Sequence, residues 1–171
     1  MTPADLRLPG ALFLTVLGLQ AGGFAETPYR RRLQALRGWV LALERVESEI
    51  RHGRRDLEQA LRLAAQDAPE TVAAALGQFA EGTGELLSTA ALWERALACD
   101  EDLRAEDRAV LAVLGPVLGR YAPEEQGRHL AAVRQTLGRL ERDADSALKS
   151  RGRAVRVLLG LCGAAIAILV V

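Results

Sequence analysis

The chain has 171 residues, with 22 basic and 22 acidic side chains, so its formal net charge is zero. This length allows one domain with a modest hydrophobic core. A neutral chain has no general electrostatic attraction to polyanions, so we expect no nucleic-acid partner.

An apolar segment lies near the N-terminus. From Leu8 to Ala25, only Thr15 and Gln20 are polar. The hydrocarbon core of a bilayer is about 30 Å thick and needs ~20 apolar residues in a helix, with a lower limit near 17. We therefore predict that residues 1–25 form an N-terminal membrane anchor in contact with lipid.

Amphipathic helices are expected between residues 26 and 154, because apolar residues recur there every three or four positions. The first helix should begin at Pro28, with Thr27 as its cap, and run to about His52. Its inward stripe is predicted to contain Leu33, Leu36, Val40, Leu43, Val46 and Ile50.

Four shorter helices are expected next, beginning at Asp56, at Pro69, after a Ser88 cap and at Asp107. Pro116 should kink the last of them or shorten its final turn, because proline lacks a backbone N–H and clashes with the carbonyl four residues earlier. The predicted core residues are Leu57, Ala60, Leu61, Ala64, Val72, Leu76, Phe79, Ala80, Leu92, Trp93, Ala96, Leu97, Val110, Leu111, Leu114, Val117 and Leu118.

The last predicted helix begins at Pro123, and no proline follows it before Val171. We predict one helix of ~49 residues, roughly 70 Å long, whose first half packs on the domain. Its apolar residues recur at strict 3,4 spacing and form a coiled-coil-type seam of Leu130, Val133, Leu137, Leu140, Ala144 and Ala147. The expected fold class is all-α, a bundle of about six helices.

The end of that helix, Val157 to Val171, is apolar and uncharged. At about 1.5 Å per residue it reaches only ~22 Å, less than a full bilayer core. It can still span if Arg153 and Arg156 extend their charged ends to the headgroup layer. We therefore predict a C-terminal membrane segment at residues 155–171, after a helical domain at residues 26–154.

Basic residues at the inner ends of the two apolar segments predict the orientation. They are Arg30, Arg31, Arg32 and Arg37 after the first segment, and Lys149, Arg151, Arg153 and Arg156 before the second. By the positive-inside rule, the domain between them is cytoplasmic. A cleavable signal peptide is the alternative for the first segment, because Gly23 and Ala25 end it with small residues, although a secretory signal carries its positive charge before the apolar core.

Small residues four positions apart allow membrane helices to approach closely. The candidate packing pairs are Gly18 with Gly22 in the first segment and Gly160 with Ala164 in the second. They could join the two segments or two copies of the chain in a homo-oligomer. Gly115 and Gly119 repeat this spacing inside the domain, where we expect close helix packing.

The sequence contains no arrangement that indicates catalysis. Enzymes need a nucleophile with a base, an acid–base pair, a metal cluster or a phosphate-binding loop. His52 and His129 are far apart and have no Cys or His nearby at ligand spacing. We therefore expect neither an enzyme nor a cofactor or metal site.

Two interpretations are open for the end of the first predicted helix. Extending its apolar stripe places Glu47 at an inward position, where a carboxylate needs a positive partner or water. Glu47 either pairs with Arg51 on a solvated helix face, or belongs to a surface that docks a partner. The candidate docking residues are Glu47, Glu49, His52, Arg54 and Arg55.

Two stretches of the domain carry recognisable motifs. The first reads Val46-Glu47-Ser48-Glu49-Ile50-Arg51-His52-Gly53, followed by Leu57 and Ala60-Leu61. The second contains Asp107, Leu111, Leu114-Gly115, Leu118-Gly119, Glu124-Glu125-Gln126 and Leu130. Together with Trp93-Glu94 and Ala96-Leu97, they resemble the stage III sporulation protein AB family of endospore-forming bacteria. The sequence departs from the family's pattern at His52, Asp56 and Ala122, where the family tends to have Tyr, Pro and Asp.

The resemblance implies a function that the residue patterns do not. The family sits in the mother-cell membrane around the developing forespore, within a secretion-like assembly. Its cytoplasmic domain is similar to those of inner-membrane platform proteins in type II secretion and type IV pilus machines. By this likeness we expect a platform that contacts a secretion-type ATPase and is not itself an enzyme. The alternative is a membrane-tethered helical adaptor or regulatory binding module unrelated to secretion.

Overall fold

The structure, a computed structural model, describes residues 28–52, 55–82 and 88–170, with side chains as far as Ser150. Helices dominate these residues, and none of them lies in a strand, so the predicted all-α class is confirmed. The chain divides into two compact units. One is the helical bundle, Arg31–Ala144, and the other combines Met1–Arg30 with Asp145–Val171.

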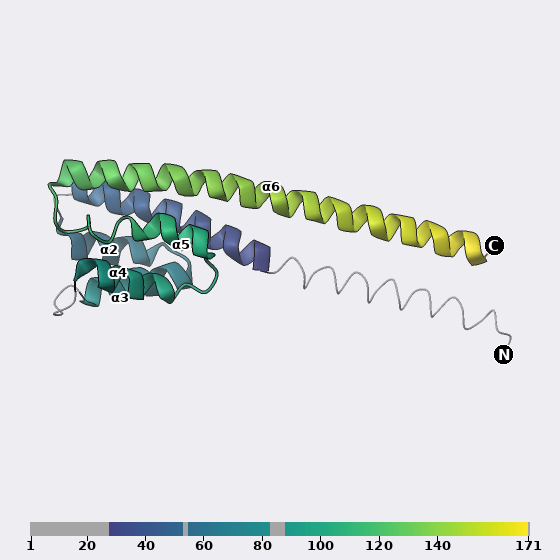
Figure 1. Cartoon of the computed structure of the whole chain (residues 1–171), viewed down its shortest axis with the longest axis horizontal. Coiled ribbons are helices and arrows are strands. Elements are labelled where there is room, and N and C mark those ends of the chain that lie inside the picture. The colour runs from purple at the N-terminus through teal and green to yellow at the C-terminus, as the bar shows by residue number, and fades with distance from the viewer. Residues whose placement is uncertain (1–27, 53–54, 83–87, 171) are drawn as a thin grey trace. The chain divides into compact units, whose positions relative to one another are not determined.

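The helices follow one another in the predicted order (Figure 1). They are a first helix over residues 28–51, α2 (Leu57–Gln66), α3 (Glu70–Gly82), α4 (Thr89–Ala98), α5 (Ala105–Ala112) and α6 (Pro123–Val170). Consecutive helices pack on one another from α2 to α5. The prediction of one helix from Pro123 through the last apolar segment is confirmed.

Within the bundle, the first helix and the start of α6 form an antiparallel pair (Figure 1). The contacts that align them are Arg37 with Glu141, Glu44 with Arg134, and Arg51 with Gly127. Each step of seven residues forward on the first helix corresponds to seven residues backward on α6. This register is the one expected when two helices present heptad-spaced stripes to each other.

Local sequence signals explain where the shorter helices begin. The Asp56 carboxylate accepts a hydrogen bond from the Gln59 N–H at 2.8 Å and caps α2. The Ser88 hydroxyl accepts one from the Ala91 N–H at 3.3 Å and caps α4. Each cap satisfies an N–H that the first turn of a helix leaves without a partner. Both predicted starts are confirmed, and α3 begins directly after Pro69.

Pro116 has a larger effect than predicted. Helix α5 ends at Ala112, four residues before the proline, and residues 113–120 form consecutive turns. The Gly115 N–H donates to the carbonyl of Ala112, three residues earlier, at 3.0 Å. An α-helix would instead pair it with the residue four positions earlier, so the chain here turns more tightly. Proline cannot sit in the next helical turn, because its ring meets that carbonyl. The prediction of a helix through Leu118 was therefore wrong, although Leu118 is buried as expected.

The core is centred on three aromatic side chains. Trp93 makes edge-to-face contacts with Trp39 and Phe79, with ring centroids 5.8 Å and 4.9 Å away. Such pairs contribute ~0.5 to 1.5 kcal/mol beyond the area that they bury. Trp39 was absent from the predicted stripe, because the buried face of the first helix is wider than one stripe. That face also contains Ala35 and Ala42.

The seam predicted on α6 is partly confirmed. Leu130, Val133, Leu137 and Ala144 are buried, whereas Leu140 and Ala147 are half-buried. Leu137 is completely inaccessible to solvent. The seam therefore already packs on the bundle at Leu130 to Leu137 and becomes more exposed further along the helix.

The predicted membrane segments are not confirmed. Among the described residues, no helix combines the length and apolar composition needed to cross a bilayer. The N-terminal anchor at residues 1–25, with Gly18 and Gly22, lies outside the described residues. Gly160 and Ala164 lie in α6, beyond the last described side chain.

Candidate partner-docking site

The candidate docking residues lie where the first helix ends and α2 begins. Glu47 and Glu49 are on the helix, His52 is in the turn that ends it, and Arg55 precedes α2. Arg54 lies outside the described residues. His52 and Arg55 are exposed, whereas the Glu47 and Glu49 side chains are only 12% and 11% exposed. The two carboxylates are therefore mostly covered by the protein itself.

Glu47 connects the first helix to α6. Its Oε1 lies 3.2 Å from Nη1 of Arg51, one turn further along, as the i,i+4 interpretation predicted. Its Oε2 lies 3.4 Å from Nη2 of Arg134 on α6, whose Nη1 also pairs with Glu44. The inward position of Glu47 is thus explained by a positive partner on the neighbouring helix.

Glu49 closes the turn between the first helix and α2. Its Oε2 accepts a hydrogen bond from Nη1 of Arg55 at 2.5 Å, and its Oε1 lies 3.3 Å from Nε of Arg45. Both oxygens therefore have cationic partners within the chain. A docking protein that bound Glu47 or Glu49 would first have to displace these arginines, which lowers the binding energy available from either carboxylate.

The turn before α6 is held by one glutamine. Gln126 accepts a hydrogen bond from the Gly119 N–H at 3.1 Å and donates one to the Tyr121 carbonyl at 2.6 Å. Gly119 has φ of +74°, a conformation that strongly favours glycine. Gly115 is explained differently, by close packing, because a Cβ at this position would lie 3.0 Å from Cα of Ala90. Close packing is confirmed at Gly115 only.

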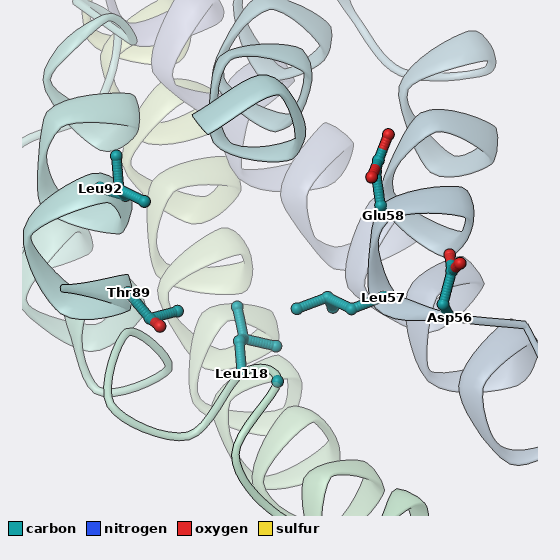
Figure 2. Close-up of a pocket in the computed structure, with 7 residues that line it drawn as sticks. Asp56, Leu57, Glu58, Thr89, Leu92 and Leu118 are labelled. Carbon is teal, nitrogen blue, oxygen red and sulfur yellow. The ribbon is translucent and has the colours of Figure 1, made fainter. Parts of the chain in front are cut away.

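A groove opens beside this turn. It has a volume of about 340 Å³ and is lined by Asp56, Leu57, Glu58, Thr89, Leu92, Leu118 and Gly119. Figure 2 shows the ends of Leu57 and Leu118 pointing toward one another, with Thr89 and Leu92 of α4 opposite Asp56 and Glu58 of the α2 start. The groove was not predicted, because it forms from segments that are far apart in the chain.

A buried ion pair lies elsewhere in the bundle. Arg32 donates to both carboxylate oxygens of Asp107, from Nε and Nη2, at 2.8 Å each, and Nη2 also donates to Glu106 at 2.6 Å. These hydrogen bonds raise the pKa of Arg32, although burial acts in the opposite direction. Asp107 also accepts from the Arg104 N–H at 3.0 Å, at the start of α5. Arg32 was predicted as a membrane-flanking charge, but its side chain is bound inside the bundle.

A second buried carboxylate is held by a tryptophan. Trp39 Nε1 donates to Oδ2 of Asp100 at 2.9 Å, and the Asp102 N–H donates to Oδ1 at 3.2 Å. Asp100 is completely buried, and this desolvation raises the pKa of its carboxyl group, while the Trp39 hydrogen bond opposes the rise. A 3,4-spaced pattern that included Arg32, Leu36, Trp39 and Leu43 could have indicated that Arg32 and Trp39 face inward, although not which carboxylates they meet.

Several polar side chains of the bundle thus join helices, among them Arg32, Trp39 and Arg134. In the part of the chain that the structure describes, no group of three or more His, Cys, Asp or Glu is placed to hold a metal ion. The fold and these contacts define an all-α helical-bundle protein. Comparison with known proteins identifies the family.

The family model for stage III sporulation protein AB matches residues 7–171. The chain is also similar to a solved structure described as stage III sporulation protein AB, with 25% sequence identity and a TM-score of 0.62. That similarity covers 70% of this chain and 97% of the solved one. No match was found among curated protein sequences. The chain belongs to the stage III sporulation protein AB family and therefore has a role in sporulation.

Proposed function

We propose that this protein is a structural platform of a secretion-like sporulation complex, and that its bundle docks a secretion-type ATPase. The observation that carries the proposal is the family match over residues 7–171. The all-α bundle supports it, because a helical domain is what the platform likeness implies. The bundle would act by binding, without catalysis or a cofactor.

The proposed location is the mother-cell membrane that faces the forespore. Residues 1–25 and 155–171 would attach the chain to lipid, with residues 26–154 in the cytoplasm. The flanking arginines support this orientation through the positive-inside rule. The small-residue pairs Gly18 with Gly22 and Gly160 with Ala164 would let the two segments, or two copies of the chain, pack closely.

Direct binding tests the platform function. The full-length chain, reconstituted in lipid nanodiscs, is titrated with the secretion-type ATPase proposed as its partner, and with an unrelated hexameric ATPase as the control. We expect saturable binding to the first ATPase only. Equal binding to both, or to neither, would contradict the proposed function.

The orientation can be tested with the protein's own thiol. Cys99 is exposed on the bundle, and Cys162→Ser leaves it as the single cysteine. The chain is expressed in non-sporulating cells, so that the membrane that holds it faces the medium. We expect a membrane-impermeant maleimide to label Cys99 only after these cells are permeabilised. A variant that lacks both cysteines is the control for background. Labelling of Cys99 in intact cells would reverse the orientation and favour the signal-peptide alternative.

A further inference from the structure

We propose that the groove between α2, α4 and the 118–119 turn is where the partner docks, and that it accepts a basic segment carrying one large apolar side chain. The apolar side chain would enter between Leu57 and Leu118, and an arginine or lysine would face Asp56 and Glu58. This inference rests on the proposed function, because it specifies the surface and chemistry of the ATPase contact.

The floor of the groove determines the apolar part of the partner. Leu57, Leu92 and Leu118 line it from three different segments (Figure 2). Leu92 and Leu118 are buried and Leu57 is half-buried, so a partner side chain would mainly contact Leu57. Its volume of about 340 Å³ lies at the lower end of the range for ligand pockets, roughly 300 to 1,000 Å³. The space suits one large aliphatic or aromatic side chain and is too small for a whole helix.

The rim determines the charge of the partner. Both charged residues that line the groove, Asp56 and Glu58, are acidic. Asp56 uses Oδ1 to cap α2, and Glu58 uses Oε1 to accept from Arg62 at 2.8 Å, which leaves a second oxygen on each carboxylate for a partner. The groove therefore favours a cationic segment and disfavours an anionic one. Charges at an interface rim mainly determine specificity and association rate, so the two carboxylates select the partner.

The predicted docking carboxylates are less accessible to a partner than the rim of the groove. Glu47 and Glu49 are mostly covered and already bind Arg51, Arg134 and Arg55. Glu58, in contrast, is 47% exposed at the mouth of the groove. The docking surface is thus displaced from the end of the first helix to the start of α2, immediately after Arg55.

Two substitutions test the groove without removing a core side chain. Glu58→Lys reverses the charge of the rim, and Thr89→Trp fills the groove from α4, where Thr89 is half-buried. Glu94→Lys and Ala132→Trp make the same chemical changes at exposed positions that do not line the groove. Each variant is made in the full-length chain in nanodiscs and titrated with the same ATPase, and circular dichroism melts establish that it folds.

We expect each groove variant to weaken ATPase binding at least tenfold, which is about 1.4 kcal/mol, and each control to stay within twofold of the parent. If the parent binds the ATPase and both folded groove variants bind equally well, the groove inference fails while the proposed function stands. If the parent does not bind, both fail. Sedimentation of each chain alone, without the ATPase, provides a further check. Self-association that the groove variants abolish and the controls retain would assign the groove to a second copy and overturn the inference.

Discussion

The first helix forms arginine–carboxylate ion pairs in two different surroundings, one exposed to solvent and one buried. Toward α6, the ion pairs of Arg37 with Glu141 and of Arg134 with Glu44 lie at the solvent edge of an apolar seam. Elsewhere on the same helix, Arg32 reaches a completely buried Asp107. Solvent-exposed pairs contribute little because water screens them, whereas removing one member of a buried pair leaves an uncompensated charge. The distances are nearly equal, 2.8 Å for Arg32 with Asp107 and 2.9 Å for Arg37 with Glu141. We therefore expect the surroundings of these pairs, rather than the distance between their charged atoms, to determine how much each contributes to stability.

The largest expected effect is the loss of the buried pair. Asp107→Ala leaves Arg32 with only the exposed Glu106 carboxylate and should lower the free energy of unfolding by ~3 to 5 kcal/mol. Glu106→Ala removes a partner of the same arginine at the surface and should lower it by less than ~1 kcal/mol. Urea unfolding followed by circular dichroism measures both. Equal losses would show that burial does not distinguish the two carboxylates.

The seam with α6 can be probed next. Leu137→Ala should lower the free energy of unfolding by ~2 to 5 kcal/mol, because Leu137 is completely buried and its truncation leaves a cavity. Leu140→Ala should have a clearly smaller effect, because Leu140 is half-buried. The same unfolding assay on the two single variants compares them. A larger loss at Leu140 would mean that the seam packs in a different register.

The buried Asp100 makes stability depend on pH. The pKa of Asp100 is raised in the folded state, so the folded protein binds the carboxyl proton more tightly than the unfolded chain does. This tighter proton binding stabilises the fold at low pH, and the stabilisation is lost as pH rises from the unfolded pKa through the folded one. Asp100→Asn cannot ionise and still offers an oxygen to Trp39. The stability of this variant relative to the parent should therefore increase as pH rises above about 4, the ordinary pKa of an aspartate carboxyl group. A constant difference across unfolding titrations at several pH values would contradict the raised pKa.

The smallest expected effect concerns Glu47. Glu47→Gln weakens its pairs with Arg51 and Arg134 but keeps a hydrogen-bonding side chain, so the free energy of unfolding should fall by less than ~1 kcal/mol. ATPase affinity should stay within twofold of the parent, because the docking surface is the groove. A tenfold loss of affinity in the folded variant would instead support docking at the end of the first helix.

Much of the helical order could be predicted because its causes lie within a few residues of each other. Asp56 and Ser88 cap their helices through N–H groups three residues ahead, and Pro69 immediately precedes α3. The length of α5 was mispredicted because the apolar spacing continues through Leu118 although the backbone cannot remain helical near Pro116. Of the candidate docking residues, only the local pair of Glu47 with Arg51 was anticipated together with its partner.

The sequence by itself determined the all-α class, the helix order, the caps of α2 and α4 and most of the core, because helical periodicity and capping act over one or two turns. Tertiary structure alone decided which distant side chains meet. The partners of Arg32 and Trp39 lie 75 and 61 residues away, and the groove combines residues from α2, α4 and the 118–119 turn. Such contacts depend on how helices pack in three dimensions, and the spacing of residues along one helix does not specify that packing.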